Sequence, residues 1–155
     1  MVEHVFRRAA LFPRWNGLYL ATCDEAIADV ARASGFSTIV TSDRHTRALD
    51  RVAEAAAKCD QALAADDVVV CVQGDEPMLQ PAMMDSVLDP LEADPHVPCT
   101  VLAMEIIDEQ QFRSPDTVKI VHDLRGDVVY TSRSPIPHAD TFTSDLGARR
   151  IYGIL

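Results

Sequence analysis

The spacing of hydrophobic residues changes between two periods along the chain, and this change predicts an α/β fold. Residues 2–11 carry apolar side chains at helical spacing, whereas residues 17–22 and 36–41 are short apolar runs of strand length. Between those two strands, Asp24 is suited to cap a helix and Gly35 to end it. A strand, a helix and a second strand in this order indicate a right-handed crossover between parallel strands.

The longest uninterrupted apolar run, the valine segment (residues 68–72), predicts a central strand of a parallel sheet that is buried on both faces. It is followed by the carboxylate loop (residues 73–77, Gln-Gly-Asp-Glu-Pro). Ligands of open α/β sheets bind beyond the carboxyl ends of such strands, so we expect Asp75 at the mouth of a cleft. Its carboxylate is suited to a divalent metal ion. The alternative is an ordinary strand exit with solvated acidic side chains.

The remaining pattern predicts helices and strands that alternate up to the C-terminus. They are a helix over 47–63, a helix that begins at Pro81 and ends by Leu88 because Pro90 follows, a strand over 98–107, a short helix over 108–112, a hairpin of 117–122 with 127–132, a loop over 134–147 and a strand from 148.

Composition narrows the class of protein. The chain has 155 residues, of which 48% are hydrophobic and 25% charged, so we expect one globular domain over residues 1–155. A net charge of −10 argues against binding to a nucleic-acid backbone but leaves a nucleotide possible. The sequence contains no run long enough to cross a membrane and no signal peptide, and its four cysteines are too widely spaced for a zinc site. A cytoplasmic protein with reduced thiols is the interpretation that fits.

Three stretches of the chain together resemble the signatures of the CMP-KDO synthetases, the 3-deoxy-manno-octulosonate cytidylyltransferases. They are the carboxylate loop, residues 41–45 with 50–54, and residues 117–121 with 130–137, in matching order. The resemblance implies a Rossmann-like nucleotide-diphospho-sugar transferase fold with a mostly parallel mixed sheet. It also implies that the fold is incomplete here, because the family's first strand, its phosphate-binding loop and its C-terminal part with a further metal-binding carboxylate have no counterpart in these residues.

The implied reaction joins CTP to an acidic sugar, KDO, and releases pyrophosphate, for lipopolysaccharide or capsule synthesis. The implied cofactor is Mg²⁺ and the implied assembly is a homodimer. By resemblance, Asp75 is the metal ligand and a catalytic group, and Gln73, Asp50 and Arg51 bind the nucleotide. From the residues alone, Gln73 is as well explained by a hydrogen bond at the strand end, and Asp50 with Arg51 by an ion pair on the helix surface.

Two basic residues in the third stretch are candidates for contact with the sugar acid. Arg133 follows a strand, where its guanidinium is suited to bind the sugar carboxylate and to act in catalysis. Lys119 lies within a strand and is a second substrate-binding candidate, although a solvated position on a strand edge is the better interpretation. The resemblance implies a histidine that contacts substrate near position 150. Because Arg150 replaces that histidine here, its role is not assigned to this chain.

One departure bears on activity. The family has Ser-Gly-Thr before the aspartate that Asp50 matches, and this chain has Arg47, Ala48 and Leu49 there. We therefore hold two hypotheses of different class, a KDO cytidylyltransferase and a catalytically inactive remnant or interaction module of the same fold, and expect the isolated chain to lack turnover. A neuraminate-type cytidylyltransferase is a third alternative.

Overall fold

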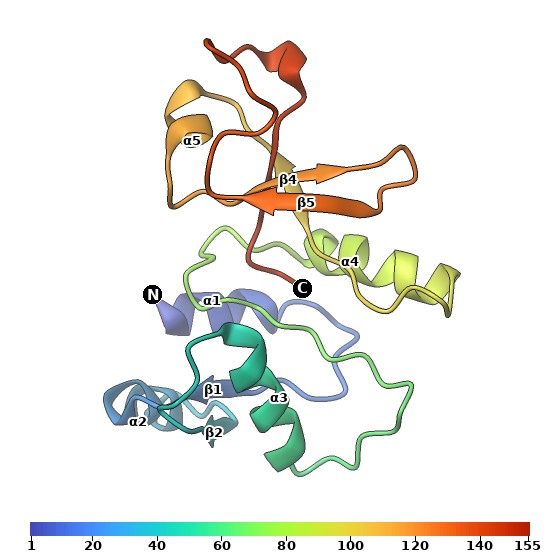
Figure 1. The fold of residues 1–155 in the computed structure, drawn as a ribbon. Helices are drawn as coiled ribbons and strands as arrows, with labels where there is room; N and C mark the ends of the chain where they lie inside the picture. Colours follow the sequence, from blue (N-terminus) through green and yellow to red (C-terminus); the bar gives the residue numbers. More distant parts are fainter. The chain divides into compact units, whose positions relative to one another are not determined.

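The computed structural model describes all residues, 1–155, and divides into two compact units (Figure 1). The first unit consists of Met1–Thr100 with Gly153–Leu155, and the second of Val101–Tyr152. Whether they act as the single domain expected from the sequence stays a prediction, and each unit is described by itself.

The first unit contains four helices and one pair of parallel strands. The helices are α1 (Val2–Ala9), α2 (Glu25–Ala33), α3 (Ala48–Lys58) and α4 (Pro81–Ala93), and the strands are β1 (Leu20–Thr22) and β2 (Thr38–Val40). β1 and β2 pair in parallel, with Leu20 opposite Thr38. The predicted strand–helix–strand crossover is thereby confirmed.

The local signals that predicted α2 act as expected. The Asp24 carboxylate accepts a hydrogen bond from the Ile27 N–H at 3.1 Å, which caps the helix. After the helix, Gly35 has a φ of 75°, in the left-handed region that glycine adopts without steric cost. Within α2, the side chains of Ala28 and Ala31 are fully buried. Small side chains therefore let this helix lie close to the strands that it connects.

The valine segment corrects a prediction, because it is neither a regular strand nor buried on both faces. Its one ladder contact is a bridge between Val72 and Ile154, and that bridge is antiparallel. Val68 and Val69 are 51% and 46% exposed, whereas Cys71 is buried. An apolar run shows that a segment has no polar face, but it does not show how many strands lie beside that segment. Here the valine segment pairs along one edge only, with the last residues of the chain.

Two helix ends also differ from the predictions. α3 ends at Lys58 rather than at residue 63. α4 starts at Pro81 as expected but continues past Pro90 to Ala93. A proline removes only one N–H from the ladder, and the Pro90 carbonyl still accepts a bond from the Asp94 N–H at 3.2 Å.

The second unit is built on an antiparallel sheet, so the prediction of a mostly parallel sheet is wrong. Its strands lie in the order β3, β6, β4, β5, and all three pairings are antiparallel. Its elements are β3 (Ala103–Glu105), α5 (Glu109–Arg113), β4 (Lys119–His122), β5 (Val128–Ser132), a 3₁₀ turn (Ser144–Leu146) and β6 (Arg149–Ile151). The predicted hairpin is confirmed as β4 and β5, with Gly126 at a φ of 93° in its turn.

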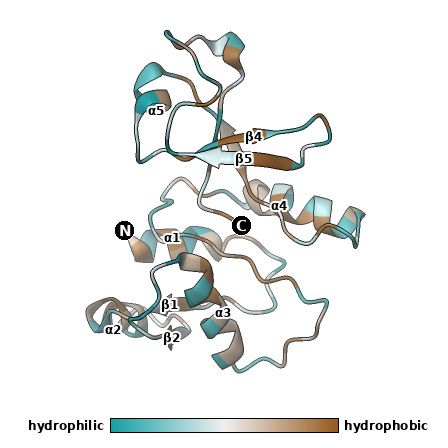
Figure 2. Cartoon of the chain, in the orientation of Figure 1, coloured by the Kyte–Doolittle hydropathy of each residue, from teal (hydrophilic) through white to brown (hydrophobic).

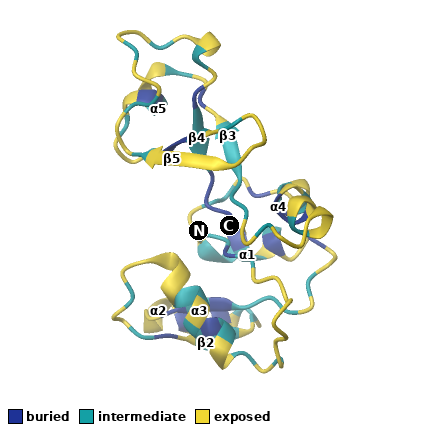
Figure 3. Ribbon diagram, turned by 45° about the vertical axis from the view of Figure 1, so that its right-hand side comes forward, coloured by how far each residue is buried: buried dark blue, intermediate teal, exposed yellow.

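Burial in the second unit is uneven. Ile106, Phe112 and Ala148 form a small core. By contrast, β5 is hydrophobic over much of its length (Figure 2) and exposed over most of it (Figure 3). Val128 and Val129 in this strand are 51% and 66% exposed. None of the helices in either unit has the length and apolarity that crossing a membrane requires.

Candidate functional site

The carboxylate loop is anchored at its start by the last residues of the chain. The Cys71 N–H donates to the Leu155 carbonyl at 2.7 Å, and the Leu155 N–H donates back to the Cys71 carbonyl at 3.1 Å. One step further on, the Gln73 N–H donates to the Gly153 carbonyl at 2.8 Å. These backbone bonds fix where the valine segment ends and where the loop begins.

Glu76 holds the middle of the loop through a close approach to Gly153. The Gly153 N–H donates to Glu76 Oε1 at 2.8 Å. A Cβ atom added at Gly153 would lie 2.8 Å from that oxygen and 2.9 Å from the Gln73 Cβ, closer than such atoms pack. Only glycine fits at this position without a shift of its neighbours, and Glu76 shapes the loop through its bond to the Gly153 N–H.

Asp75 differs from its neighbour because its carboxylate is left free. The residue is exposed, and no hydrogen bond or ion pair of the structure engages its side chain. No group of three or more metal-ligating side chains is present. A single free carboxylate on an anchored turn fits Mg²⁺, which takes one or two carboxylates and completes its shell with water and substrate phosphates.

The Arg51 side chain is hydrogen-bonded to the loop that precedes α3. Its Nη1 donates to Thr41 Oγ1 at 2.6 Å and to the Ser42 carbonyl at 3.1 Å, and its Nη2 donates to the His45 carbonyl at 3.4 Å. The alternative of a surface ion pair with Asp50 is therefore wrong, because Arg51 ties the helix to residues 41–45. Asp50 itself is exposed in the first turn of α3.

Glu54 is a residue of this site to which the sequence assigned no role. Its carboxylate accepts bonds from the Ser42 N–H at 3.2 and 3.0 Å and contacts His45 Nε2 and Lys58 Nζ. Lys58, then Ser42 and His45, lower the pKa of Glu54 to about 2. Lys58 one turn further along α3 is the signal that was available, since charges four residues apart pair on a helix.

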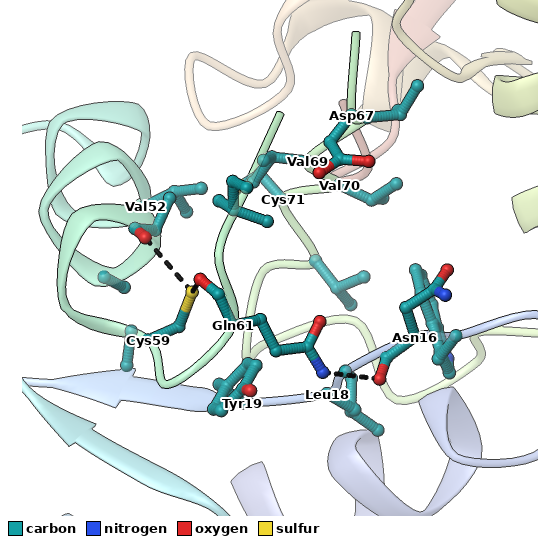
Figure 4. Close-up of a pocket in the computed structure, with 18 of the residues that line it drawn as sticks. Asn16, Leu18, Tyr19, Val52, Cys59, Gln61, Asp67, Val69, Val70 and Cys71 are labelled. Atoms are coloured by element: carbon teal, nitrogen blue, oxygen red, sulfur yellow. Dashed lines mark hydrogen bonds between the residues drawn. The ribbon is translucent and has the colours of Figure 1, made fainter. Parts of the chain in front are cut away.

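A cavity of about 920 Å³ opens beside this part of the first unit (Figure 4). Gln73 and Arg51 both line it, so two of the predicted nucleotide-binding residues share one space. Asp50 and Asp75 are not among its lining residues. The cavity is also lined by the valine segment and by Leu18 and Tyr19, which lie in the segment just before β1.

Lys119 and Arg133 come together in the second unit, and the solvated-edge interpretation of Lys119 is wrong. Lys119 is 0% exposed. Its Nζ donates to the carbonyls of Ser114, Thr117 and Arg133 at 2.6, 2.9 and 2.7 Å. Burial, and to a lesser extent the Arg133 charge, lowers the pKa of this amine.

Arg133 lies on the surface of the second unit, above the buried lysine. Its Nη1 donates to the Pro115 carbonyl at 2.7 Å, and the residue is otherwise exposed. Lys119 holds the Arg133 backbone while the guanidinium keeps donors in solvent. Lys119 thus fixes the backbone, and Arg133 presents an accessible cationic group.

A family model described as cytidylyltransferase matches residues 1–153 of the chain. The chain therefore belongs to the cytidylyltransferase family. Within it, the chain is 40% identical over 146 residues to a 3-deoxy-manno-octulosonate cytidylyltransferase of Geobacter metallireducens, covering 94% of this chain and 56% of that protein. It is 42% identical over 137 residues to the protein of the same name from Nitratidesulfovibrio vulgaris, covering 88% of this chain and 53% of the relative. The resemblance to the CMP-KDO synthetases is confirmed.

A solved structure agrees with the sequence relatives. It is described as CMP:2-keto-3-deoxy-manno-octonic acid synthetase complexed with CTP, and it matches with a TM-score of 0.81 and 30% identity. The match covers 99% of this chain and 61% of the solved one. The chain spans about half the length of the curated relatives that it matches.

Proposed function

We propose that this chain carries the nucleotide and metal site of a cytidylyltransferase that activates KDO with CTP, giving CMP-KDO and pyrophosphate. The observation that carries the proposal is the free Asp75 carboxylate, held on an anchored turn in a chain of this family. Relatives named for the same reaction support the choice of KDO as the acidic sugar.

Asp75 would hold Mg²⁺ together with oxygens of the CTP phosphates. When bound, the ion neutralises phosphate charge and orients the nucleotide for attack on its α-phosphorus. The part of this chain is to keep one carboxylate rigid and solvent-accessible. Glu76 and Gly153 do so through the bond that fixes the turn.

The nucleotide base would meet Gln73 and the start of α3. An amide side chain carries both a donor and an acceptor, which suits the edge of cytosine. Arg51 then acts mainly by holding the loop of residues 41–45, since three of its donor contacts are made within the protein. Asp50 is left as an exposed acceptor next to that loop.

The sugar-acid carboxylate would meet Arg133. A guanidinium binds a carboxylate through two parallel N–H bonds, and its exposed position leaves donors for this purpose. Lys119 supports that residue from below rather than touching substrate, because its amine already donates to three carbonyls.

One observation favours the second candidate, a noncatalytic module of the same fold. Arg47 and Leu49 flank Ala48 where the resemblance implies Ser-Gly-Thr, and Leu49 is 53% exposed at the start of α3. A bulky arginine and an apolar leucine replace a hydroxyl and a close backbone approach. This change weakens the base contact without affecting the carboxylate loop.

We also propose that two copies of the chain associate through the β4–β5 hairpin. Val128, Val129 and Tyr130 are all more than half exposed on a sheet edge, and such an edge finds a partner readily. In sedimentation we expect a dimer that Val129→Lys converts to monomer. A wild-type monomer at high micromolar concentration would contradict this assembly.

The proposed reaction is tested by pyrophosphate release from CTP and Mg²⁺, with KDO, with N-acetylneuraminate or with no sugar. Release that requires KDO is expected of the enzyme, and Arg133→Lys should raise the KM for the sugar because the two-point contact is lost. Selective CTP binding without release would favour the noncatalytic module. Equal binding of CTP, UTP and ATP would contradict both candidates.

A further inference from the structure

The carboxylate loop begins two successive turns of the backbone. The first turn (residues 73–76) has Asp75 at a corner and is closed by a bond from its last N–H to its first carbonyl at 3.3 Å. The second turn (residues 76–79) is closed in the same way at 3.2 Å. Pro77 stands at the second position of this turn, where proline is favoured. Because Glu76 belongs to both turns, contacts that fix the second turn also limit the movement of the first.

Two side chains of α1 donate to backbone carbonyls of the second turn. His4 Nε2 lies 3.0 Å from the Pro77 carbonyl oxygen, and since a carbonyl only accepts, this ring nitrogen carries the proton. Arg8 Nε donates to the Leu79 carbonyl. His4 and Arg8 are four residues apart, so they lie one helical turn apart on the same face of α1. Together they hold the second turn at two points.

These two bonds connect parts of the chain that are distant in sequence. They join residues 73 and 71 positions apart. Within the second turn, Leu79 is buried, but Met78 is 67% exposed and Pro77, which has no N–H, is only half-buried. The bonds from α1 therefore reach the part of the turn that the protein interior covers least.

The first turn is held from elsewhere, by the end of the chain. The Gln73 N–H donates to the Gly153 carbonyl, and the Gly153 N–H donates to Glu76. The backbone that carries Asp75 is thus fixed by the chain end and, through the second turn, by α1. Contacts that orient a metal ligand without touching the ion matter for binding, and their loss typically lowers metal affinity by about 10–100-fold.

We propose that His4 and Arg8 are positioning residues for Asp75, so that α1 sets how much magnesium strengthens the binding of CTP. The inference rests on the proposed function, because it takes Asp75 as the ligand of the ion. His4 and Arg8 hold carbonyls of the second turn rather than contacting the ion, and the second turn keeps the Asp75 backbone in place.

The experiment measures, by calorimetry of the full chain, the gain in CTP affinity that Mg²⁺ produces. His4→Leu and Arg8→Met each remove one donor to the second turn, and we expect each to reduce this gain by about tenfold. The affinity for CTP without Mg²⁺ should change by less than about twofold. A role in stability alone would lower the Tm and leave the gain unchanged in the folded chain.

Three variants serve as matched controls. Arg8→Lys and His4→Gln keep an N–H donor on a side chain of similar reach, so they should retain most of the gain. Arg7→Met removes the neighbouring arginine of α1, which binds Glu3 of the same helix at 2.8 Å. This variant should keep the magnesium gain within about twofold of the wild-type value.

Amide hydrogen exchange without nucleotide tests the contact separately from the metal. The Glu76 and Leu79 N–H groups close the first and the second turn. We expect both to exchange about tenfold faster in the double variant His4→Leu/Arg8→Met than in the wild-type chain. The Gln73 N–H, which Gly153 holds, should exchange at an unchanged rate.

An undiminished magnesium gain in the folded double variant would overturn the proposal. Unchanged exchange at Glu76 would also overturn it, because α1 would then have no influence on the turn that carries Asp75. A wild-type chain without any magnesium gain would overturn the proposed function together with this inference. That result differs from failure of the inference alone, in which the wild type has a gain that the variants share. Where Arg8→Met fails to fold, His4→Leu decides the matter, since His4 is exposed.

Discussion

Lys119 and Asp75 show how differently one chain treats two isolated charges. The Lys119 amine is fully buried and donates to three carbonyls, so no donor remains for a ligand. The Asp75 carboxylate is exposed and makes no hydrogen bond or ion pair, although the backbone on either side of it is anchored. A buried charge whose hydrogen bonds are all made within the protein stabilises the fold, whereas an unpaired charge on an anchored backbone is available for binding.

The same contrast recurs between adjacent residues of the carboxylate loop. Glu76 is occupied by the Gly153 N–H, and Asp75 beside it is not. Acidic side chains in one motif therefore divide into an anchor and a candidate ligand. Substitutions of anchoring groups and of the free carboxylate should separate stability from binding, and four of them differ in their expected effect on stability, from the largest to the smallest.

The largest effect is expected for Lys119→Met. This change leaves three carbonyl groups without their donor in the interior of the second unit, and we expect a loss of about 3 kcal/mol in the free energy of unfolding. Urea denaturation measures it. Arg133→Met is the matched control, since that exposed side chain makes a single bond to Pro115 and should cost less than about 1 kcal/mol. Equal losses would show that the buried amine is not an organising group.

Gly153→Ala should come next. Its new methyl group would collide with Glu76 Oε1 and the Gln73 Cβ, and overpacking of this kind costs about 1–3 kcal/mol. Gly74→Ala is the control, because its Cβ would meet only Val2 Cγ2 at an ordinary 3.6 Å. Thermal unfolding compares the two. If both variants melt alike, the close approach at Gly153 does not hold the loop.

Glu54→Gln tests the loop before α3 through pH. The pKa of Glu54 falls from its ordinary 4.5 to about 2 in the folded chain, so its stabilising effect is present above pH 4.5 and is lost as pH falls towards 2. We expect the difference in Tm between wild type and Glu54→Gln to shrink across that window. Asp50→Asn, on an exposed side chain, should show no such change. A pH-independent difference for Glu54→Gln would contradict the assignment.

What the sequence predicted well depended on short-range signals. Asp24 and Gly35 bound α2, and Gly126 turns the hairpin, because capping and turn conformations are decided within a few residues.

What it missed depended on partners distant in the chain. The valine segment looked central because all its residues are apolar, yet its pairing comes only from Gly153–Leu155 on one edge. Lys119 looked solvated because alternation along a strand cannot show that three carbonyls surround its amine. Glu54 received no role because its bond to Ser42 spans a loop whose path the pattern does not give.

The smallest effect on stability and the largest on binding are expected at Asp75, and this residue tests the central claim most directly. Asp75→Asn keeps the shape of the side chain and removes its charge. Calorimetry of CTP with and without Mg²⁺ should show that the ion strengthens CTP binding to the wild-type chain and adds nothing in Asp75→Asn. The free energies of unfolding of the two chains should agree within about 0.5 kcal/mol. Equal magnesium-dependent gains in CTP affinity for the two chains would contradict the assignment of Asp75 as the metal ligand.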